Sequence, residues 1–247
     1  MNHSLPHFSG RFWQKHADQT SHRPLVIVAF GDSVTMGATT QGVFIPEEVY
    51  HSRLKRMIAE RYPGPAAATL SVINSGIGGD TATKALLRLD RDVLCFRPDL
   101  VLLAFGANDL SLDPAASAAF ERSVVRMVSA IRAQTSSDIV IVTPTRMASR
   151  ENRASADEGY LRVLMQFQNG GVVARYAEIL RTVGRAEGLP VADVYAQWEQ
   201  LEASGVDTTS KLINGLNHPS AEMHEIHARE IFRIIQAGLD LDRQNRP

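Results

Sequence analysis

The amino-acid sequence predicts an α/β fold: a three-layer α/β/α sandwich on a mostly parallel, flavodoxin-like sheet of about five strands. Three observations lead to this prediction. Short apolar runs recur along the chain, as is typical of strands that are covered on both faces. Segments with helical periodicity separate these runs. The alternation continues over the whole length, and right-handed crossovers then leave few topologies.

Each expected strand is a short run rich in aliphatic or β-branched residues. In chain order these runs are Leu25–Phe30, Thr69–Ile73, Leu100–Phe105, Ile139–Val142 and, more weakly, Pro190–Val194. Each expected helix carries an apolar stripe that we expect to face the core. The stripes are Ala82, Ala85, Leu86, Leu89 and Val93; Phe120, Val124, Met127, Val128 and Ile131; Tyr176, Ile179, Leu180 and Val183; and Ile231, Ile234 and Ile235.

The chain has 247 residues, which suits one α/β domain with a full core. Apolar residues make up 44% of it and charged residues 21%, a balance typical of globular proteins. We find no internal repeat or low-complexity linker. The expected organisation is an N-terminal extension over residues 1–24, one domain over residues 25–240 and a C-terminal tail over residues 241–247.

Charge and hydropathy exclude several classes of partner. The formal net charge of −1 gives no reason to expect nucleic acid or an anionic membrane as a partner. The sequence contains no run of about 18 apolar residues, so we do not expect a transmembrane segment. Residues 1–24 lack the apolar core of a secretory signal, so we expect a cytoplasmic protein. The single Cys95 has no internal disulfide partner and is expected to be a buried, inert thiol.

Polar and glycine-rich segments follow the expected strands. Gly31–Ser33 follows the first strand, Asn74–Thr81 the second and Gly106–Asp109 the third. A fourth segment, Asn214–Pro219, precedes the last helix. Because ligands bind beyond the carboxyl ends of parallel strands, we expect these segments to gather at one edge of the sheet.

These segments contain the groups that acyl transfer requires. The hydroxyl of Ser33, in a tight turn, becomes a nucleophile once a base removes its proton. His218 is the candidate base, and Pro219 fixes the backbone after it. The backbone N–H groups of Ser33 and Gly79 and the amide of Asn108 are candidate donors to an oxyanion. The expected catalytic residues are therefore Ser33, His218, Gly79 and Asn108.

Together the four segments resemble the SGNH superfamily of GDSL esterases and lipases, over roughly Val26 to Leu239. The four residues that name this superfamily match Ser33, Gly79, Asn108 and His218. A lone GDS tripeptide arises often by chance, whereas all four segments in family order are a specific signal. The resemblance implies ester hydrolysis through an acyl-serine, a three-layer α/β/α fold and no cofactor.

The sequence departs from the family pattern three residues before His218, where Gly215 replaces the usual Asp. We associate this variant, NGLNHP, with carbohydrate-esterase-like and other small-ester members. The group that holds Nδ1 of His218 therefore stays open. It is a side chain of Asn214, Asn217 or Asp207, or a backbone carbonyl, and a Ser-His dyad is plausible.

Several other polar residues favour structural roles. Asp32 and Asp109 are expected to bond loop amides, and Asp80 with Thr81 marks a helix start. His51 favours a surface or packing role over a place in the pocket.

His224 and His227 have an i, i+3 spacing that can suit a metal, but no carboxylate or thiolate cluster joins them, so no metal is expected. The GIGGD segment lacks the spacing and the lysine of a phosphate-binding loop, which argues against nucleotide binding.

The expected partner is a small-molecule ester, with a short acyl group such as acetyl, carried by a sugar, as the first choice. Residues 34–47 and 146–170 are expected to form the pocket wall. Neither segment is an apolar lid suited to long acyl chains. A lysophospholipase or thioesterase acting on longer chains is the rival among enzymes. A non-catalytic binding module, disabled by the missing Asp, is the rival from another class. The sequence does not predict the oligomeric state.

Overall fold

The computed structural model describes residues 5–40, 42–155 and 157–246. Its centre is a five-stranded parallel sheet in the order β2-β1-β3-β4-β5. This is the flavodoxin-like order that the sequence predicts, so the predicted fold is confirmed. The strands are β1 (Val26–Gly31), β2 (Ser71–Gly76), β3 (Leu100–Ala104), β4 (Asp138–Val142) and β5 (Val191–Ala192).

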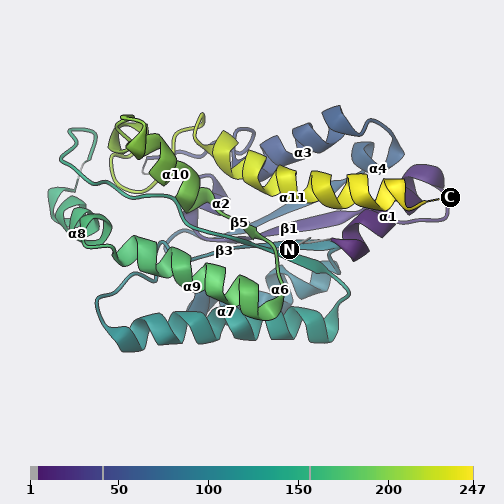
Figure 1. Ribbon diagram of the computed structural model, residues 1–247, viewed down its shortest axis with the longest axis horizontal. Helices are drawn as coiled ribbons and strands as arrows, with labels where there is room; N and C mark the ends of the chain where they lie inside the picture. The colour runs from purple at the N-terminus through teal and green to yellow at the C-terminus, as the bar shows by residue number, and fades with distance from the viewer. Residues whose placement is uncertain (1–4, 41, 156, 247) are drawn as a thin grey trace.

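Helices cover both faces of this sheet (Figure 1). One layer consists of α1 (Pro6–Ala17), α3 (Tyr50–Arg61), α4 (Pro65–Ala68), α10 (Val194–Ala203) and α11 (His224–Gln244). The opposite layer consists of α5 (Ala82–Ala85), α6 (Leu89–Asp92), α7 (Pro114–Gln134) and α9 (Val172–Glu187). Two further helices are α2 (Ser33–Met36), directly after β1, and α8 (Glu158–Asn169), at the left end of Figure 1. Within the described ranges, no helix combines the length and the apolar character that crossing a bilayer requires.

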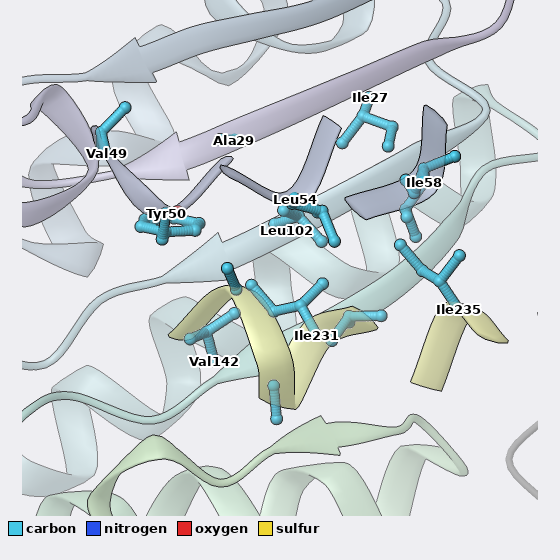
Figure 2. Close-up of a cluster of buried hydrophobic side chains, with 14 of the residues drawn as sticks. Ile27, Ala29, Val49, Tyr50, Leu54, Ile58, Leu102, Val142, Ile231 and Ile235 are labelled. Carbon is cyan, nitrogen blue, oxygen red and sulfur yellow. The ribbon is translucent and has the colours of Figure 1, made fainter. Parts of the chain in front are cut away.

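Successive side chains of the inner strands enter opposite cores. Ile27 and Ala29 of β1 face α3 and α11, whereas Val28 and Phe30 face α7 and α9. Figure 2 shows the first of these cores, in which buried side chains of α3 and α11 meet those of β1, β3 and β4. Burial on both faces is the reason why these strands are continuous apolar runs in the sequence.

The second strand differs from the one expected at Thr69–Ile73. It is an edge strand whose residues are exposed or half-buried, and it extends through the polar Asn74 and Ser75 to Gly76. Its backbone pairs with β1 residue by residue up to Gly31. Backbone pairing, rather than apolar side chains, therefore sets its length.

The stripe from Ala82 to Val93 packs in the core as expected, but its segment is not one helix. It is divided into α5, a 3₁₀ turn (Leu86–Arg88) and α6, and a second 3₁₀ turn follows at Leu94–Phe96. Cys95 lies in that second turn with an exposed side chain, and its thiol donates to the carbonyl of Arg91 (2.7 Å). The prediction of a buried thiol is wrong, because the helical phase on which it relied ends before Cys95.

The expected boundary at residue 25 does not separate α1 from the core. Phe8 and Phe12 of α1 are fully buried. The indole N–H of Trp13 donates to the carbonyl of Leu239 on α11 (3.0 Å). Helix α11 also runs into the expected tail and ends at Gln244. Residues 6–17 are thus an integral part of one helical layer.

Phe12→Ala should lower the free energy of unfolding by about 3–5 kcal/mol, because it empties the space of a buried aromatic ring. Urea unfolding followed by circular dichroism measures this change. Leu87→Ala is the matched control: the Leu87 side chain is 91% exposed, so the expected change stays within about 0.5 kcal/mol. Wild-type stability in Phe12→Ala would mean that α1 is a dispensable appendage.

Candidate active site

The segments that follow β1, β2 and β3 meet the segment before α11 around a cleft of about 510 Å³. Ser33, Gly79, Asn108 and His218 all line this cleft. The structure therefore brings together the four residues expected to carry catalysis. Parallel strands produce this convergence because their carboxyl ends lie at the same edge of the sheet.

Ser33 and His218 are in hydrogen-bond contact. Asp32 caps α2 by accepting from the backbone N–H of Val34 (2.9 Å), which fixes Ser33 at the first position of the helix. The hydroxyl oxygen of Ser33 lies 2.9 Å from Nε2 of His218. This distance suits transfer of the hydroxyl proton to the imidazole.

The other ring nitrogen of His218, Nδ1, lies 2.6 Å from the carbonyl oxygen of Thr39. A carbonyl oxygen can only accept, so Nδ1 must carry the ring hydrogen. Nε2 is then the unprotonated nitrogen and accepts the hydroxyl hydrogen of Ser33. The Thr39 carbonyl therefore selects the tautomer in which His218 can act as a base.

The three side chains that the sequence offered as partners of Nδ1 have other contacts. Asn214 Oδ1 accepts from the backbone N–H of His218 (2.9 Å) and from the two N–H groups before it, while its Nδ2 donates to Asn217 (3.0 Å). Asp207 bonds the backbone N–H groups that follow it and pairs with Arg150. The expectation that a side chain of Asn214, Asn217 or Asp207 orients His218 is therefore wrong. These side chains shape turns, and a backbone carbonyl, the fourth alternative, is the group that contacts Nδ1.

The conformation of Gly215 explains why the usual acid is missing. Its φ of +68° lies in the left-handed region that favours glycine. A Cβ atom at this position would also lie 2.8 Å from the backbone nitrogen of Ser155. An Asp here would have to displace the backbone of residues 154 and 155, so the loop packing excludes the acid.

The Thr39 carbonyl belongs to a braced loop. The backbone N–H and the hydroxyl of Thr39 both donate to the carbonyl of Val43 (2.9 and 3.0 Å), and Ala38 forms a bridge with Phe44. Thr40 and Phe44 from the same loop line the cleft. The sequence admitted a backbone carbonyl only as a class, because every residue has one and no residue type identifies it.

Two groups beside Ser33 have the properties of oxyanion donors. Gly79 has a φ of +72°, and apart from its chain neighbours no described residue has an atom within 4 Å of where its Cβ would stand, so its backbone is open to an approaching ligand. The amide of Asn108 donates to the carbonyl of Asp80 (3.0 Å). An amide nitrogen has two hydrogens, so this bond fixes the side chain and leaves one hydrogen for another acceptor.

Sequence reasoning missed Arg88, which joins the nucleophile turn to the glycine loop. Its buried guanidinium donates to the carbonyls of Gly31 (3.0 Å) and Ser75 (2.8 Å) and pairs with Asp80 (2.7 Å). It also lies over the ring of Phe30, 4.4 Å from its centroid. No sequence signal marks it, because an arginine within a helical stretch is ordinarily solvent-exposed.

Two carboxyl groups lie beneath the site, the buried Asp32 and the half-buried Asp109. Burial, with repulsion from Asp109 and Asp80, raises the pKa of Asp32 to about 7. Burial, with repulsion from Asp80, raises the pKa of Asp109 to about 6. Both groups have the expected structural role, but the amides that they bond belong to the first turns of helices rather than to loops: Asp32 accepts from Val34 of α2 and Asp109 from Ala82 of α5 (2.9 Å each). Asp32 is therefore partly protonated near neutral pH, which limits the negative charge below Ser33.

Burial lowers the pKa of His218 below its ordinary value, and the hydrogen bond to the Thr39 carbonyl offsets part of this effect. A carboxylate partner would act more strongly in the upward direction because it carries a full negative charge. His218 therefore stays in its neutral, basic form into mildly acidic conditions.

The other histidines singled out in the sequence are packing residues. His51, His224 and His227 are buried, and their rings lie 5.3, 6.3 and 5.5 Å from that of Tyr50, counted between centroids. His51 also contacts the carbonyl of Thr35 on α2 (3.1 Å). Within the described ranges, no three or more His, Cys, Asp or Glu residues are grouped as metal ligands would be.

The buried histidines make a contribution to the free energy of unfolding that decreases as the pH falls from about 6.5 to about 4, whereas the raised pKa values of Asp32 and Asp109 act in the opposite direction. A comparison of variants therefore isolates the histidine contribution. Burial lowers the pKa of His51 and of His227 to about 4 in the folded protein. The unfolded chain takes up these protons near the ordinary value of about 6.5, so acid favours unfolding within this window. The contribution is fully present above pH 6.5. Urea midpoints at several pH values measure it.

His227→Phe provides the test variant, because phenylalanine keeps an aromatic ring but takes up no proton. As the pH falls from about 6.5 to about 4, its urea midpoint should rise relative to that of the wild type. His22→Gln removes a histidine outside the cluster and should keep the wild-type slope. Equal slopes for all three proteins would contradict the assignment.

The cleft wall combines apolar and polar side chains. From the expected segment 34–47, Met36, Ala38, Thr39, Thr40, Gly42 and Phe44 line it; from segment 146–170, Ala154, Asp157 and Tyr160 do. The arginines of the second segment are absent from the lining that the structure describes. Asp157 is the one carboxylate among the described lining residues, so this side chain dominates the charge of the cleft.

The chain is similar to known proteins in sequence and in fold. The family described as GDSL-like Lipase/Acylhydrolase matches residues 29–226. A lipase/acylhydrolase from Enterococcus faecalis is similar in structure, with 30% identity, a TM-score of 0.64, and coverage of 86% of this chain and 95% of that one.

Two other proteins are similar over most of the chain. Acetylxylan esterase Axe2 from Geobacillus stearothermophilus shares the fold at 17% identity, with a TM-score of 0.64 and coverage of 85% of this chain and 94% of that one. The uncharacterized lipoprotein YqeF of Bacillus subtilis is 27% identical over 228 residues, which are 88% of this chain and 90% of that protein.

Proposed function

Because the chain belongs to the GDSL-like lipase/acylhydrolase family and is a carboxylic ester hydrolase, we propose that Ser33 and His218 carry its catalysis. The observation that supports this most directly is the relay from the Ser33 hydroxyl through His218 to the Thr39 carbonyl, with distances of 2.9 and 2.6 Å. The three groups act as a nucleophile, a base and a backbone orienter.

The proposed reaction has two halves. Ser33 Oγ attacks the ester carbonyl carbon while Nε2 of His218 accepts the hydroxyl proton, and the carbonyl electron pair moves onto oxygen. The N–H groups of Ser33 and Gly79 and the amide of Asn108 donate to this oxyanion. Collapse breaks the bond to the alcohol oxygen, which takes the proton from His218. Water, activated by the same His218, then releases the acid and regenerates Ser33.

Ser33→Ala should reduce kcat toward p-nitrophenyl acetate by more than about 10³-fold, because no other group can form the acyl-enzyme. Asn108→Ala should reduce kcat by about 10²–10³ with little change in KM, since its bond strengthens in the transition state. Ser117→Ala, on α7 away from the cleft, is the control and should match the wild type. Activity in Ser33→Ala above a few per cent, or an Asn108→Ala effect confined to KM, would contradict these roles.

For the substrate, we propose a short acyl group on a hydroxylated alcohol such as a carbohydrate. The methyl carbon of Met36 lies 3.2 Å from where a Cβ of Gly78 would stand. Met36 thus covers the backbone next to the donor Gly79 and limits the space beside the acyl carbonyl. The likeness in fold to an acetylxylan esterase agrees with the carbohydrate assignment.

Hydrolysis of longer acyl chains is the second candidate. Phe44 is 51% exposed at the cleft, and Ala38 and Leu216 add apolar surface to the lining. These residues offer a place for a longer chain, provided that Met36 moves aside.

An acyl-length series decides between the two candidates. We expect a higher kcat/KM for acetyl and propionyl esters than for octanoyl esters, measured below micelle-forming concentrations. Met36→Ala should shift the preference toward butyryl and hexanoyl esters by removing the obstructing side chain. Met57→Ala, on α3 outside the cleft lining, is the control. A wild-type optimum at eight carbons or more would overturn the short-acyl assignment.

A further inference from the structure

If the proposed function holds, one wall of the cleft contacts the acyl part of the ester and the other wall contacts the alcohol part. The oxyanion donors of Ser33, Gly79 and Asn108 follow β1, β2 and β3 and surround the acyl carbonyl. His218 comes from the segment before α11 and must reach the alcohol oxygen to protonate it. The alcohol part therefore leaves along the wall that flanks His218.

Asp157 belongs to that wall. Residues 154 and 155 pack against the loop of His218, since a Cβ on Gly215 would lie 2.8 Å from Ser155 nitrogen and 3.1 Å from the carbonyl carbon of Ala154. Asp157 follows two residues later and lines the cleft together with Ala154 and Tyr160. This chain of contacts places the carboxylate on the alcohol side of the site.

The carboxylate of Asp157 is held in place and retains accepting capacity. One oxygen caps α8 by accepting from the backbone N–H of Tyr160 (2.8 Å). The hydroxyl of Ser155 accepts from the backbone N–H of Asp157 (3.2 Å) and donates to the carbonyl of Asp157 (3.1 Å). Among the described residues, no cationic side chain forms an ion pair with Asp157, and its second oxygen accepts no hydrogen bond. An ionised carboxylate has about four acceptor sites, so most of them remain for a ligand.

Two arginines of this region are paired with other carboxylates. Arg150 pairs with Glu202 and Asp207, and Arg162 lies 3.9 Å from Glu158. Arg162 and Glu158 line a separate hollow rather than the cleft. The alcohol therefore meets a carboxylate that forms no ion pair with an arginine of the described residues.

We propose that Asp157 is a specificity-determining residue that selects uncharged, hydroxylated alcohols and disfavours anionic ones. Its oxygens accept hydrogen bonds from alcohol hydroxyl groups, which are charge-assisted and therefore stronger than neutral ones. The same charge repels a carboxylate or phosphate on the leaving alcohol. The inference rests on the proposed function, since it presumes that esters react at Ser33.

Three acetate esters of similar size separate these effects: glycerol 1-acetate, n-propyl acetate and 3-acetoxypropanoate. They present a hydroxylated, a plain and an anionic alcohol, and n-propyl acetate is the reference for each protein. For the wild type we expect the kcat/KM ratio to the reference to exceed one for glycerol 1-acetate and to lie below one for 3-acetoxypropanoate. The reverse order would overturn the proposal.

Two variants of Asp157 keep the helix cap, since Asn and Ser are both good N-cap residues. Asp157→Asn should raise the relative kcat/KM for 3-acetoxypropanoate by about two- to five-fold, the size expected for one exposed charge. Asp157→Ser should lower the relative value for glycerol 1-acetate by a similar factor, because the shorter side chain withdraws the acceptor. Unaltered ratios in both variants would defeat the proposal even with active enzymes.

Glu158→Gln is the matched control, because it removes the same charge one residue along the chain, outside the cleft lining. It should leave all three wild-type ratios unchanged. Equal effects of Glu158→Gln and Asp157→Asn would overturn the proposal, since they would indicate a general field rather than a contact. A wild-type protein that hydrolyses none of the three acetates would instead defeat the proposed function itself.

Discussion

The hydrogen bond between Nδ1 of His218 and the carbonyl of Thr39 constrains the entire site. It fixes the tautomer, directs Nε2 to Ser33 and links the base to the loop that lines the cleft. A carbonyl has only a dipole to offer an imidazolium, whereas the usual carboxylate has a full charge. The site therefore relies on position more than on charge, and the bonds that join Ala38 to Phe44 and Thr39 to Val43 supply that position.

The remaining parts of the site depend on how β1, β2 and β3 end. Arg88 holds the carbonyls of Gly31 and Ser75 together with Asp80, so the nucleophile turn and the glycine loop share one buried cation. Asp80 in turn receives the amide of Asn108 on its carbonyl. The proposed nucleophile and the proposed oxyanion donors are thus joined through a polar network beneath the cleft. Such a network restricts their relative motion, which is what a preorganised oxyanion site requires.

Much of this architecture is readable from the sequence, and the exceptions have physical reasons. The inner strands β1, β3 and β4 can be predicted from continuous apolar runs, because helices bury both of their faces. The edge strand β2 extends past its apolar residues because backbone pairing defines it. The four site segments carry rare combinations of residue types, but the partner of His218 is a backbone atom that no residue type reveals. Likewise, the sequence of α1 does not stand out as apolar, because polar residues separate its three buried aromatic side chains.

The most direct test of the account weakens the Thr39 carbonyl without altering a side chain. Replacing Thr40 by its α-hydroxy analogue converts that carbonyl into an ester carbonyl, a poorer acceptor. The lost Thr40 N–H makes no hydrogen bond with another described backbone group. A net loss of about 1 kcal/mol predicts a decrease in kcat/KM for p-nitrophenyl acetate of roughly five- to tenfold. The acid limb should move to lower pH, because this bond raises the pKa of His218. An unchanged rate together with an unchanged acid limb would contradict the claim that Thr39 orients the base.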